Sequence, residues 1–281
     1  MKRSLGGKVV AITGGARGIG LATARALVLQ GARVAIGDID GGLAKEVAEG
    51  LGGHAMGADL DVTSRDSFAA FLERVTAELG PIDVLVNNAG IMPLGQIADE
   101  PDSVTRRIVD VNLHGVILGT KLAIEHMLPR SQGHIVNVSS GVGRVALRGA
   151  ATYSATKHAV VGFSEATRAE LRAAGIDVSV VLPLIVNTEL GSGLHKVKGQ
   201  RTVEATEVAD TIAAVIAKPR FETWVPRSGN RLYRFMFLMP RSVSEAIGRA
   251  VGAADALSNT DSGARKTYES RARREADDAQ A

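Results

Sequence analysis

Short apolar runs alternate with longer amphipathic segments over the first two thirds of the chain. The apolar runs are rich in Val and Ile, are bounded by Gly, Pro or Asp, and cover 9–12, 33–37, 84–86, 134–138 and 177–182. Strands that are buried on both faces of a sheet have this composition. Between them, apolar residues recur at i, i+3 and i+4 spacing and predict helices at 19–30, 64–79, 104–128, 154–173 and 206–217.

This alternation predicts one α/β domain with a doubly wound, Rossmann-like parallel sheet between two layers of helices. We expect the domain to cover residues 1–226, with a substrate-binding loop at 184–203. The remaining residues, 227–281, are predicted to form a C-terminal extension. Its last part, from Thr260 onwards, has almost no apolar residues and is expected to be a solvent-facing helix or disordered.

Composition narrows the classes of function. The 281 residues include 45% hydrophobic and 22% charged residues, enough apolar material for a sizeable core. A formal net charge of +3 gives no strong field for nucleic acid, so no nucleic-acid partner is expected. The chain has no cysteine, which excludes disulfides and a Cys nucleophile, and its scattered histidines lack ligand spacing, so no metal site is predicted. No apolar run is long enough to span a bilayer, and a cytoplasmic protein is expected.

A glycine-rich segment joins the first predicted strand to the first predicted helix. Gly14, Gly18 and Gly20 stand in the pattern TGxxxGxG, with Arg17 and Ile19 among them. A backbone without Cβ atoms can turn sharply and approach a pyrophosphate closely. The N-terminus of the following helix offers unpaired N–H groups to phosphate oxygens. The segment therefore predicts a dinucleotide site, against the alternative of a glycine-rich turn that binds nothing.

Asp38 closes the second predicted strand and bears on the choice of cofactor. A carboxylate at this position can accept hydrogen bonds from the hydroxyls of the adenosine ribose and repels a 2′-phosphate. We therefore expect NAD(H) to be favoured, with NADP(H) as the alternative because Arg17 could pair with a phosphate. Asp38 could also be a surface residue that starts a turn.

Tyr153 and Lys157 lie four residues apart in a predicted helix and so share one face. Tyrosine ordinarily ionises near pH 10, and an adjacent ammonium is predicted to lower that pKa by about 1–3 pH units, towards the range of a general acid/base. Ser140 follows a predicted strand and could hydrogen-bond a substrate oxygen as charge develops, with Ser139 as a competing candidate. If these residues have no catalytic role, Tyr153 and Lys157 are a pair on a helix surface and Ser140 is a serine in a turn.

Four motifs accompany these residues: Asn-Asn-Ala-Gly at 87–90, Val-Asn at 111–112, Val-Ser-Ser at 138–140 and Tyr-Ser-Ala-Thr-Lys at 153–157. Together with TGxxxGxG, they resemble the single-domain branch of the short-chain dehydrogenase/reductase family over residues 7 to 225. The resemblance implies that Ser140 rather than Ser139 is catalytic, with Tyr153 as general acid/base. It also implies that Lys157 holds the nicotinamide ribose and that Asn112 helps to hold a water that links Lys157 to solvent.

The same resemblance assigns further contacts to the cofactor. Asn88, Ala89 and Gly90 would line its adenosine side, Asp61 and Val62 would touch the adenine, and Val186 and Thr188 would orient the carboxamide. From the residues alone, Asp61 could equally cap a helix, Asn88 could stabilise the central sheet, and Asn112 could hydrogen-bond a kinked helix.

Pro183-Leu184 departs from the Pro-Gly that the family usually has after its sixth strand. A leucine cannot adopt backbone angles reserved for glycine without strain. The loop could therefore follow a different path, which puts the contacts of Ile185, Val186 and Thr188 in question.

These features predict an NAD(P)-dependent oxidoreductase that interconverts an alcohol and a carbonyl on a small molecule by hydride transfer. Apolar residues near the site favour a hydrophobic substrate, such as a steroid, retinoid-like or long-chain alcohol: Met92, Leu94, Val142, Val145, Leu147 and Leu184. An epimerase or dehydratase on the same fold is one alternative, and it usually carries a larger C-terminal domain. A catalytically silent dinucleotide-binding sensor or scaffold is the other.

The chain also offers surfaces for larger partners. By resemblance, a homodimer or homotetramer is expected. Residues 224–238 mix arginines with aromatic residues and could form an interfacial helix, which would give peripheral membrane contact. The alternatives are that this segment packs on the domain or a neighbouring subunit, and that Trp224 to Pro226 form the last strand of the sheet.

Overall fold

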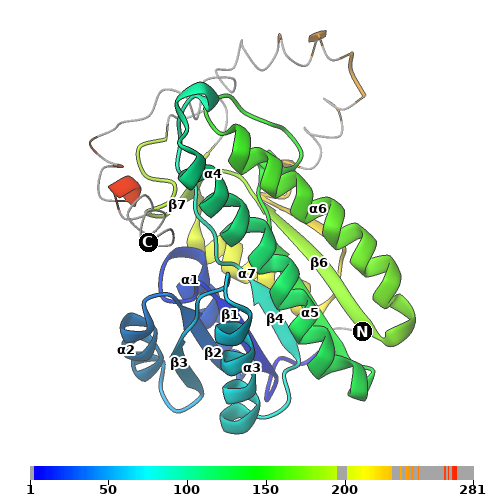
Figure 1. Ribbon diagram of the computed structural model, residues 1–281. Coiled ribbons are helices and arrows are strands. Elements are labelled where there is room, and N and C mark those ends of the chain that lie inside the picture. Colours follow the sequence, from blue (N-terminus) through cyan, green and yellow to red (C-terminus); the bar gives the residue numbers. More distant parts are fainter. Residues whose placement is uncertain are drawn as a thin grey trace.

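A parallel sheet with helices on both sides organises the protein (Figure 1). The computed structural model describes residues 3–194 and 201–229, and beyond these 235, 238–240, 242–243, 246, 263, 265 and 268–270. Seven parallel strands stand in the order β3-β2-β1-β4-β5-β6-β9. Their bounds are Val9–Thr13 (β1), Arg33–Asp38 (β2), Ala55–Asp59 (β3), Val84–Asn87 (β4), Gly133–Val138 (β5), Ile176–Pro183 (β6) and Glu222–Val225 (β9). The predicted doubly wound α/β fold is confirmed.

Helices connect these strands. They are Gly18–Val28 (α1), Gly41–Leu51 (α2), Arg65–Leu79 (α3), Asp102–Val109 (α4), Gly115–Met127 (α5), Ala151–Leu171 (α6) and Ala205–Ala217 (α7). A separate two-stranded ribbon pairs Val186–Asn187 (β7) with Val203–Glu204 (β8). The segments that the periodicity predicted at 19–30, 64–79, 154–173 and 206–217 correspond to α1, α3, α6 and α7.

Two apolar cores lie on the two faces of the sheet because successive strand side chains point to opposite sides. Along β1, Val10 and Ile12 belong to the core beneath α1, α2 and α7. Val9 and Ala11 belong to the core that includes Phe68 of α3 and residues of α5. All five residues of β1 are buried, which explains the uninterrupted apolar run in the sequence.

The order of the strands reverses direction between β1 and β4. From β1 the chain moves outward through β2 and β3, then returns to pair β4 with the other side of β1. In such sheets the loops that leave neighbouring strands diverge at their carboxyl ends and open a crevice there. The glycine-rich segment after β1 and the Asn-Asn-Ala-Gly motif of β4 both lie at this crevice.

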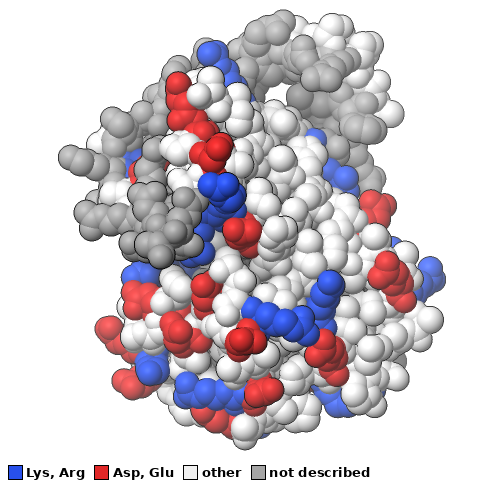
Figure 2. All heavy atoms as spheres, in the orientation of Figure 1, with Lys and Arg blue, Asp and Glu red and all other residues white. Residues whose placement is uncertain are grey.

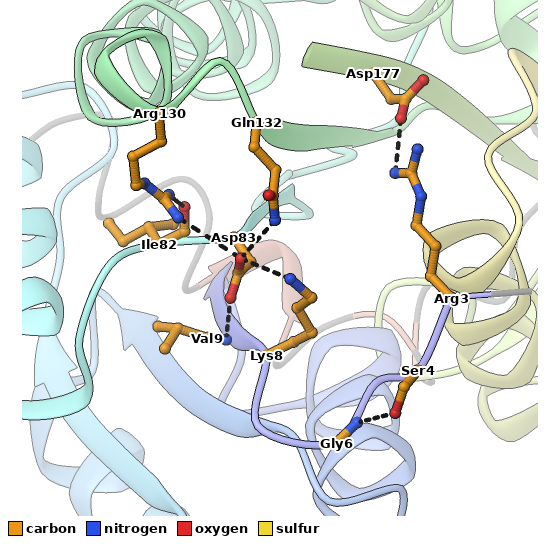
Figure 3. A network of polar contacts seen from close by, with 10 residues as sticks. All are labelled: Arg3, Ser4, Gly6, Lys8, Val9, Ile82, Asp83, Arg130, Gln132 and Asp177. Carbon is orange, nitrogen blue, oxygen red and sulfur yellow. Dashed lines mark hydrogen bonds and ion pairs between the residues drawn. The ribbon is translucent and has the colours of Figure 1, made fainter. Parts of the chain in front are cut away.

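Hydrogen bonds and ion pairs join the amino-terminal ends of the strands, at the end of the sheet opposite the crevice (Figure 3). Asp83, just before β4, accepts hydrogen bonds from Lys8 Nζ at 2.9 Å and from the Val9 backbone N–H at 3.0 Å, and pairs with Arg130 at 3.7 Å. Arg3 binds Asp177 of β6 at 2.8 Å. These contacts join the amino ends of β1, β4 and β5, far from the crevice. They stabilise the fold and take no part in the site.

Several elements differ from the sequence prediction. The strands β3, β7 and β8 and the helix α2 were not predicted, and the single helix expected over 104–128 is divided into α4 and α5 by a π-helical turn, Asp110–His114. The interfacial helix cannot begin at Trp224, because that residue is 3% exposed and lies in β9, the last strand of the sheet. The rest of that prediction falls largely on 230–234 and 236–237, outside the described residues, as does 195–200 of the substrate loop.

Figure 2 shows acidic and basic side chains interspersed on one face of the molecule. Within the described part of the chain, no helix combines the length and apolar character needed to cross a membrane.

Candidate active site

The loop after β1 has room only for glycine at two of its positions. A Cβ on Gly20 would lie 2.2 Å from the carbonyl oxygen of Gly14, and a Cβ on Gly14 would lie 2.8 Å from Ala89 Cα. Gly14 and Gly18 also have φ of +61° and +53°, which L side chains rarely adopt. The loop is therefore folded tightly against both α1 and the end of β4.

The N-terminus of α1 is prepared for an anion. The helix begins at Gly18, and Arg17, its N-cap residue, makes no side-chain capping bond. The first turn contains no acidic residue. Its leading N–H groups and the positive end of the helix dipole therefore face the loop without internal competition. Ile19, the next residue, packs against the core and holds this turn in place.

Asp38 lies at the carboxyl end of β2 and is buried beside the loop. Its two carboxylate oxygens accept hydrogen bonds from the backbone N–H groups of Ala16 at 3.0 Å and Asp40 at 3.2 Å. Arg17 is held in an ion pair with Asp40 at 2.8 Å. Asp38 is therefore not a surface turn residue. The ion pair with Asp40 weakens the use of Arg17 as a partner for a 2′-phosphate.

The end of β4 is tied to the glycine loop through Thr13. The hydroxyl of Thr13 accepts hydrogen bonds from the backbone N–H groups of Asn88 and Ala89, both at 3.0 Å. The Asn88 side chain donates to the carbonyls of Thr13 and Gly14 at 2.9 and 2.8 Å. Asn87, by contrast, bonds to Asn137 and Thr120 inside the sheet. Of the two asparagines, Asn88 is the one at the crevice.

Asp61 and Val62 follow β3 at the far side of the crevice. The Asp61 carboxylate accepts hydrogen bonds from the backbone N–H and the hydroxyl of Thr63, at 2.9 and 2.7 Å. Ser64 is the N-cap of α3. Val62 packs against Gly115, where an added Cβ would lie 3.0 Å from Val62 Cγ2. Asp61 thus organises the turn before the helix, and its contact with adenine stays a prediction.

The two candidate serines at the end of β5 have different partners. Ser139 is buried, and its hydroxyl donates to the backbone carbonyl of Lys157 at 2.9 Å. The Ser140 hydroxyl donates to the Pro183 carbonyl at 3.5 Å, accepts from the Val142 backbone N–H at 3.3 Å, and is near enough to the Tyr153 phenol to lower its pKa. Ser139 therefore fixes β5 against α6, whereas Ser140 faces the phenol.

Tyr153 and Lys157 both lie on the buried side of α6. The Lys157 amine is 5.7 Å from the centre of the Tyr153 ring and donates to the carbonyl oxygen of Val138 at 3.1 Å. A Cβ on Gly90 would lie 3.5 Å from that amine. The structure thus brings together the ends of β4 and β5 and the first turns of α6. Because Tyr153 and Lys157 are buried, the interpretation of these two residues as a helix-surface pair is wrong.

The predicted lowering of the Tyr153 pKa is wrong in direction for this structure. Burial raises the pKa of Tyr153 to about 12, and the hydrogen bond from Ser140 opposes that rise. Burial also lowers the pKa of Lys157 to about 8. The reason is that a dry site penalises every charge, and the Lys157 amine faces the ring and the Val138 carbonyl. The phenol is held in its protonated form.

Asn112 lies in the π-helical turn and is completely buried. Its amide oxygen accepts from the Ile91 N–H and its amide nitrogen donates to the Ile91 carbonyl, both at 2.8 Å. A Cβ on Gly90 would lie 3.2 Å from the same amide oxygen. Asn112 therefore fixes the loop after β4 next to Lys157. Its role in a proton relay stays a prediction. Single π turns of this kind are frequent at functional sites.

The loop after β6 accommodates Leu184 without strain. Among the described residues, the only non-glycine with positive φ is Ser131, so Leu184 does not adopt glycine's backbone angles. Its N–H donates to Val225 at 2.9 Å, and its side chain packs with Trp224. Val186 pairs with Val203 in the ribbon, and the Thr188 methyl group lies 3.4 Å from where a Gly18 Cβ would stand. Thr188 therefore lies next to the glycine-rich loop after β1, although Leu184 replaces the family's usual glycine.

An apolar cluster adjoins Tyr153. Met92 and Ala150 are buried with it, and the surrounding partly buried residues are Leu94, Val142, Leu147, Leu190 and Leu194. Most were predicted as substrate contacts. Leu184 packs instead with Trp224, and Val145 is exposed.

A family model described as short chain dehydrogenase matches residues 8–198 of the sequence. This match spans every element that builds the crevice up to the loop after β6. The chain belongs to the short-chain dehydrogenase family. The resemblance stated from the motifs is thereby confirmed.

Curated relatives of this chain include dehydrogenases that are named for alcohols on rings. It is 39% identical over 216 residues to cis-4-hydroxycyclohexanecarboxylate dehydrogenase of Sinomonas cyclohexanicum, covering 75% of this chain and 84% of the relative. It is 40% identical over 190 residues to 3-alpha-(or 20-beta)-hydroxysteroid dehydrogenase of Mycobacterium tuberculosis, covering 68% and 73%. Probable oxidoreductase EphD of M. tuberculosis is 33% identical over 261 residues, 85% of this chain, which spans only 44% of EphD.

Among solved structures, 3-ketoacyl-(acyl-carrier-protein) reductase from Brucella melitensis, complexed with NADH, has a TM-score of 0.75 and 30% sequence identity. The match covers 80% of this chain and all of that one.

Three residues that contribute to the candidate site were missed in the sequence. Thr13 gives no signal beyond ending a strand. Arg265 and Tyr268 lie in the segment expected to be solvent-facing or disordered, yet they are 2% and 6% exposed. A buried arginine is rare unless it is paired, and the surrounding sequence, rich in Arg, Glu and Ala, hides it.

Proposed function

We propose that this chain is an NAD(H)-dependent dehydrogenase that interconverts a hydrophobic ring alcohol and its ketone. The observation that carries the proposal is that Tyr153 and Lys157 are buried together on α6, with the amine 5.7 Å from the ring centre, at the carboxyl ends of β4 and β5, where Ser140 lowers the pKa of the phenol. The glycine loop fits a dinucleotide, because Gly14 and Gly20 let the backbone fold tightly between β1, the end of β4 and the N-terminus of α1, where a pyrophosphate would bind.

The proposed cofactor is NAD(H), with NADP(H) as the alternative. Asp38, already fixed by two backbone N–H groups, would accept from the ribose hydroxyls and disfavour a 2′-phosphate. Asn88, Ala89 and Gly90 would line the adenosine side, with Asp61 and Val62 at the adenine. Val186 and Thr188 would contact the carboxamide end.

The chain's own residues supply the proton chemistry. When bound, the nicotinamide donates or accepts the hydride. In the reductive direction, Tyr153 carries its proton at neutral pH, since burial raises its pKa to about 12, and gives it to the carbonyl oxygen. Ser140 hydrogen-bonds the same oxygen as charge develops on it. In the oxidative direction the phenol must first be deprotonated. Oxidation is therefore expected to accelerate with rising pH.

A ring alcohol is proposed because the wall beside Tyr153 is apolar and because two relatives act on such alcohols. A homodimer or homotetramer is proposed from the family, and the protein is proposed to act in the cytoplasm. Peripheral membrane contact remains a proposal for the residues after Pro226, where Phe235 and Leu238 are 61% and 85% exposed.

The experiment is a screen of cyclohexanols, steroids and linear alcohols with NAD⁺ and with NADP⁺, followed by the absorbance of the reduced nicotinamide. Turnover of ring alcohols with NAD⁺ is expected. Cofactor binding without turnover of any alcohol or carbonyl would instead favour the alternative of a catalytically silent, dinucleotide-binding sensor or scaffold.

A further inference from the structure

Two residues near the end of the chain are buried against the active site. Arg265 and Tyr268 are 2% and 6% exposed, although they lie far in sequence from every other residue of the crevice. Arg265 stacks over the Tyr268 ring, with its guanidinium carbon 5.1 Å from the ring centre. Both residues, and Glu269, are helical. We define these three residues as the C-terminal latch.

Arg265 joins the latch to two loops at once. Its guanidinium donates to the carbonyl oxygen of Met92 at 2.8 Å, and to those of Leu190 and Ser192 at 2.9 and 3.0 Å. Its Nε also donates to Glu269 at 3.2 Å. Four acceptors around one buried cation make this contact costly to break. The loop after β4 and the loop after β6 are therefore held by the same side chain.

Tyr268 and Glu269 bind the first of those loops. The Met92 N–H donates to the Tyr268 hydroxyl at 2.6 Å, and the Leu94 N–H donates to Glu269 at 3.3 Å. Met92, Leu94 and Leu190 are also members of the apolar cluster beside Tyr153. The latch thus grips the backbone of the residues whose side chains form the wall of the proposed substrate pocket.

The Tyr268 hydroxyl adjoins the apolar cluster of Tyr153, because Met92, whose N–H it binds, is buried in that cluster. A charge on Tyr153 also raises the pKa of Tyr268, in addition to the larger rise that burial causes. The Tyr268 oxygen is an acceptor for Met92, and no described residue accepts its own proton. A buried donor without a partner is unfavourable. A ligand oxygen next to it would satisfy it.

We propose that Tyr268 is a specificity-determining residue, which donates a hydrogen bond to a second oxygen of a ring substrate whose first oxygen reacts at Tyr153. Arg265 is the positioning residue that holds it. The inference rests on the proposed function and narrows its substrate class to ring alcohols and ketones that carry another oxygen. A site built around a buried donor discriminates strongly against a ligand that lacks the acceptor.

The test measures binding rather than turnover. Wild-type protein and Tyr268→Phe are titrated calorimetrically with 4-methoxycyclohexanone and with 4-ethylcyclohexanone, each in the presence of NAD⁺. Neither ketone carries an alcohol that NAD⁺ could oxidise, and the oxidised cofactor cannot reduce a ketone. The two ketones differ by an ether oxygen in place of a methylene group, and the two proteins differ by one hydroxyl. We expect wild type to prefer the methoxyketone, and Tyr268→Phe to reduce that preference by roughly 10- to 100-fold.

Thr211→Val is the control, since it removes a hydroxyl that donates to the Glu207 carbonyl within α7, outside the site. It should leave the preference as in wild type. An unchanged preference in Tyr268→Phe, or no binding of either ketone to wild type, overturns the inference. Binding with the expected preference but no turnover of the corresponding alcohols would overturn the proposed function alone.

Arg265→Lys tests the positioning role. Lysine keeps the charge but cannot reach three carbonyls with a rigid fork. We expect the KM for a ring diol to rise roughly tenfold with little change in kcat, because the Tyr268 donor is displaced while Tyr153 is not. A lower melting temperature with an unchanged KM would show a purely structural role and contradict the assignment.

Discussion

Ser140 lies beside the Tyr153 phenol and lowers its pKa, while the adjacent Ser139 donates its hydroxyl to the backbone carbonyl of Lys157 at 2.9 Å. Neighbouring residues on an extended backbone point in opposite directions, so the two hydroxyls serve different purposes. Ser140→Ala is expected to lower kcat by roughly 10²–10³-fold with little change in stability. Ser139→Ala should instead lower the free energy of unfolding by about 1 kcal/mol. Steady-state kinetics and urea unfolding of both variants check this. Equal loss of kcat in both would contradict the division of roles.

The motifs that carry chemistry could be predicted because each follows a strand of the buried core. Val84–Asn87 and Gly133–Val138 are buried along their whole length and rich in Val, Leu and Ile, so the positions of Asn88 and Ser140 after their carboxyl ends follow from the pattern. β3 was missed because its sequence, Ala-Met-Gly-Ala-Asp, lacks β-branched residues. The small residues are needed there: a Cβ on Gly57 would lie 2.1 Å from the Ala44 carbonyl of α2. Close packing, which periodicity does not express, decides that strand.

The C-terminal latch and the ionisation of Tyr153 could not be predicted. Arg265 and Tyr268 are buried by contacts with Met92, Leu190 and Ser192, which are remote in sequence. The pKa of Tyr153 depends on how completely the site is enclosed, and four-residue spacing to Lys157 says nothing about enclosure. Both properties depend on the tertiary structure.

Gly20 should be irreplaceable for cofactor binding, whereas Gly50 should not. Alanine at position 20 would place Cβ 2.2 Å from the Gly14 carbonyl, so the loop must open. A Cβ on Gly50, in α2, meets nothing within 4 Å. We expect Gly20→Ala to weaken NADH affinity by at least roughly 100-fold, and Gly50→Ala to leave affinity unchanged and raise stability by about 0.5–1 kcal/mol. Fluorescence titration with NADH and thermal unfolding measure the two effects. Normal affinity in Gly20→Ala would disprove the loop's role.

Asp38→Asn should shift cofactor preference towards NADP⁺. The amide keeps an acceptor for the Ala16 N–H but removes the negative charge that would face a 2′-phosphate. Like charges held together at a binding site cost several kcal/mol. The ratio of kcat/KM for NAD⁺ to that for NADP⁺ is expected to fall by roughly 10- to 100-fold. Asp40→Asn is the informative comparison, because Asp40 already pairs with Arg17 and should have a smaller effect. A wild-type preference for NADP⁺ would contradict the assignment.

His134 should make the protein less stable in acid. It is 2% exposed, hydrogen-bonds Ser179 at 2.8 Å, and burial lowers its pKa from 6.5 to about 4. The unfolded chain binds this proton below about pH 6.5, whereas the native protein does so only near pH 4, so protonation favours unfolding in that window. The free energy of unfolding is therefore expected to fall, by up to about 3 kcal/mol, as the pH drops from about 6.5 towards about 4.

Urea unfolding of wild type and His134→Gln at several pH values measures this contribution. Glutamine can keep a hydrogen bond to Ser179 but does not titrate. The variant should therefore lose less stability than wild type between about pH 6.5 and about pH 4. Parallel pH profiles for the two proteins would show that His134 does not contribute.

The central claim is that the Tyr153 phenol transfers the proton at the reacting oxygen. The most direct measurement is a comparison of Tyr153→Phe with wild type, by turnover of a ring alcohol with NAD⁺ and by NADH titration of the same samples. Phenylalanine fills the same buried space, so we expect kcat to fall by roughly 10²–10⁴-fold or more while the Kd for NADH stays within about threefold. Turnover at the wild-type rate in Tyr153→Phe, with NADH still bound, would contradict the claim.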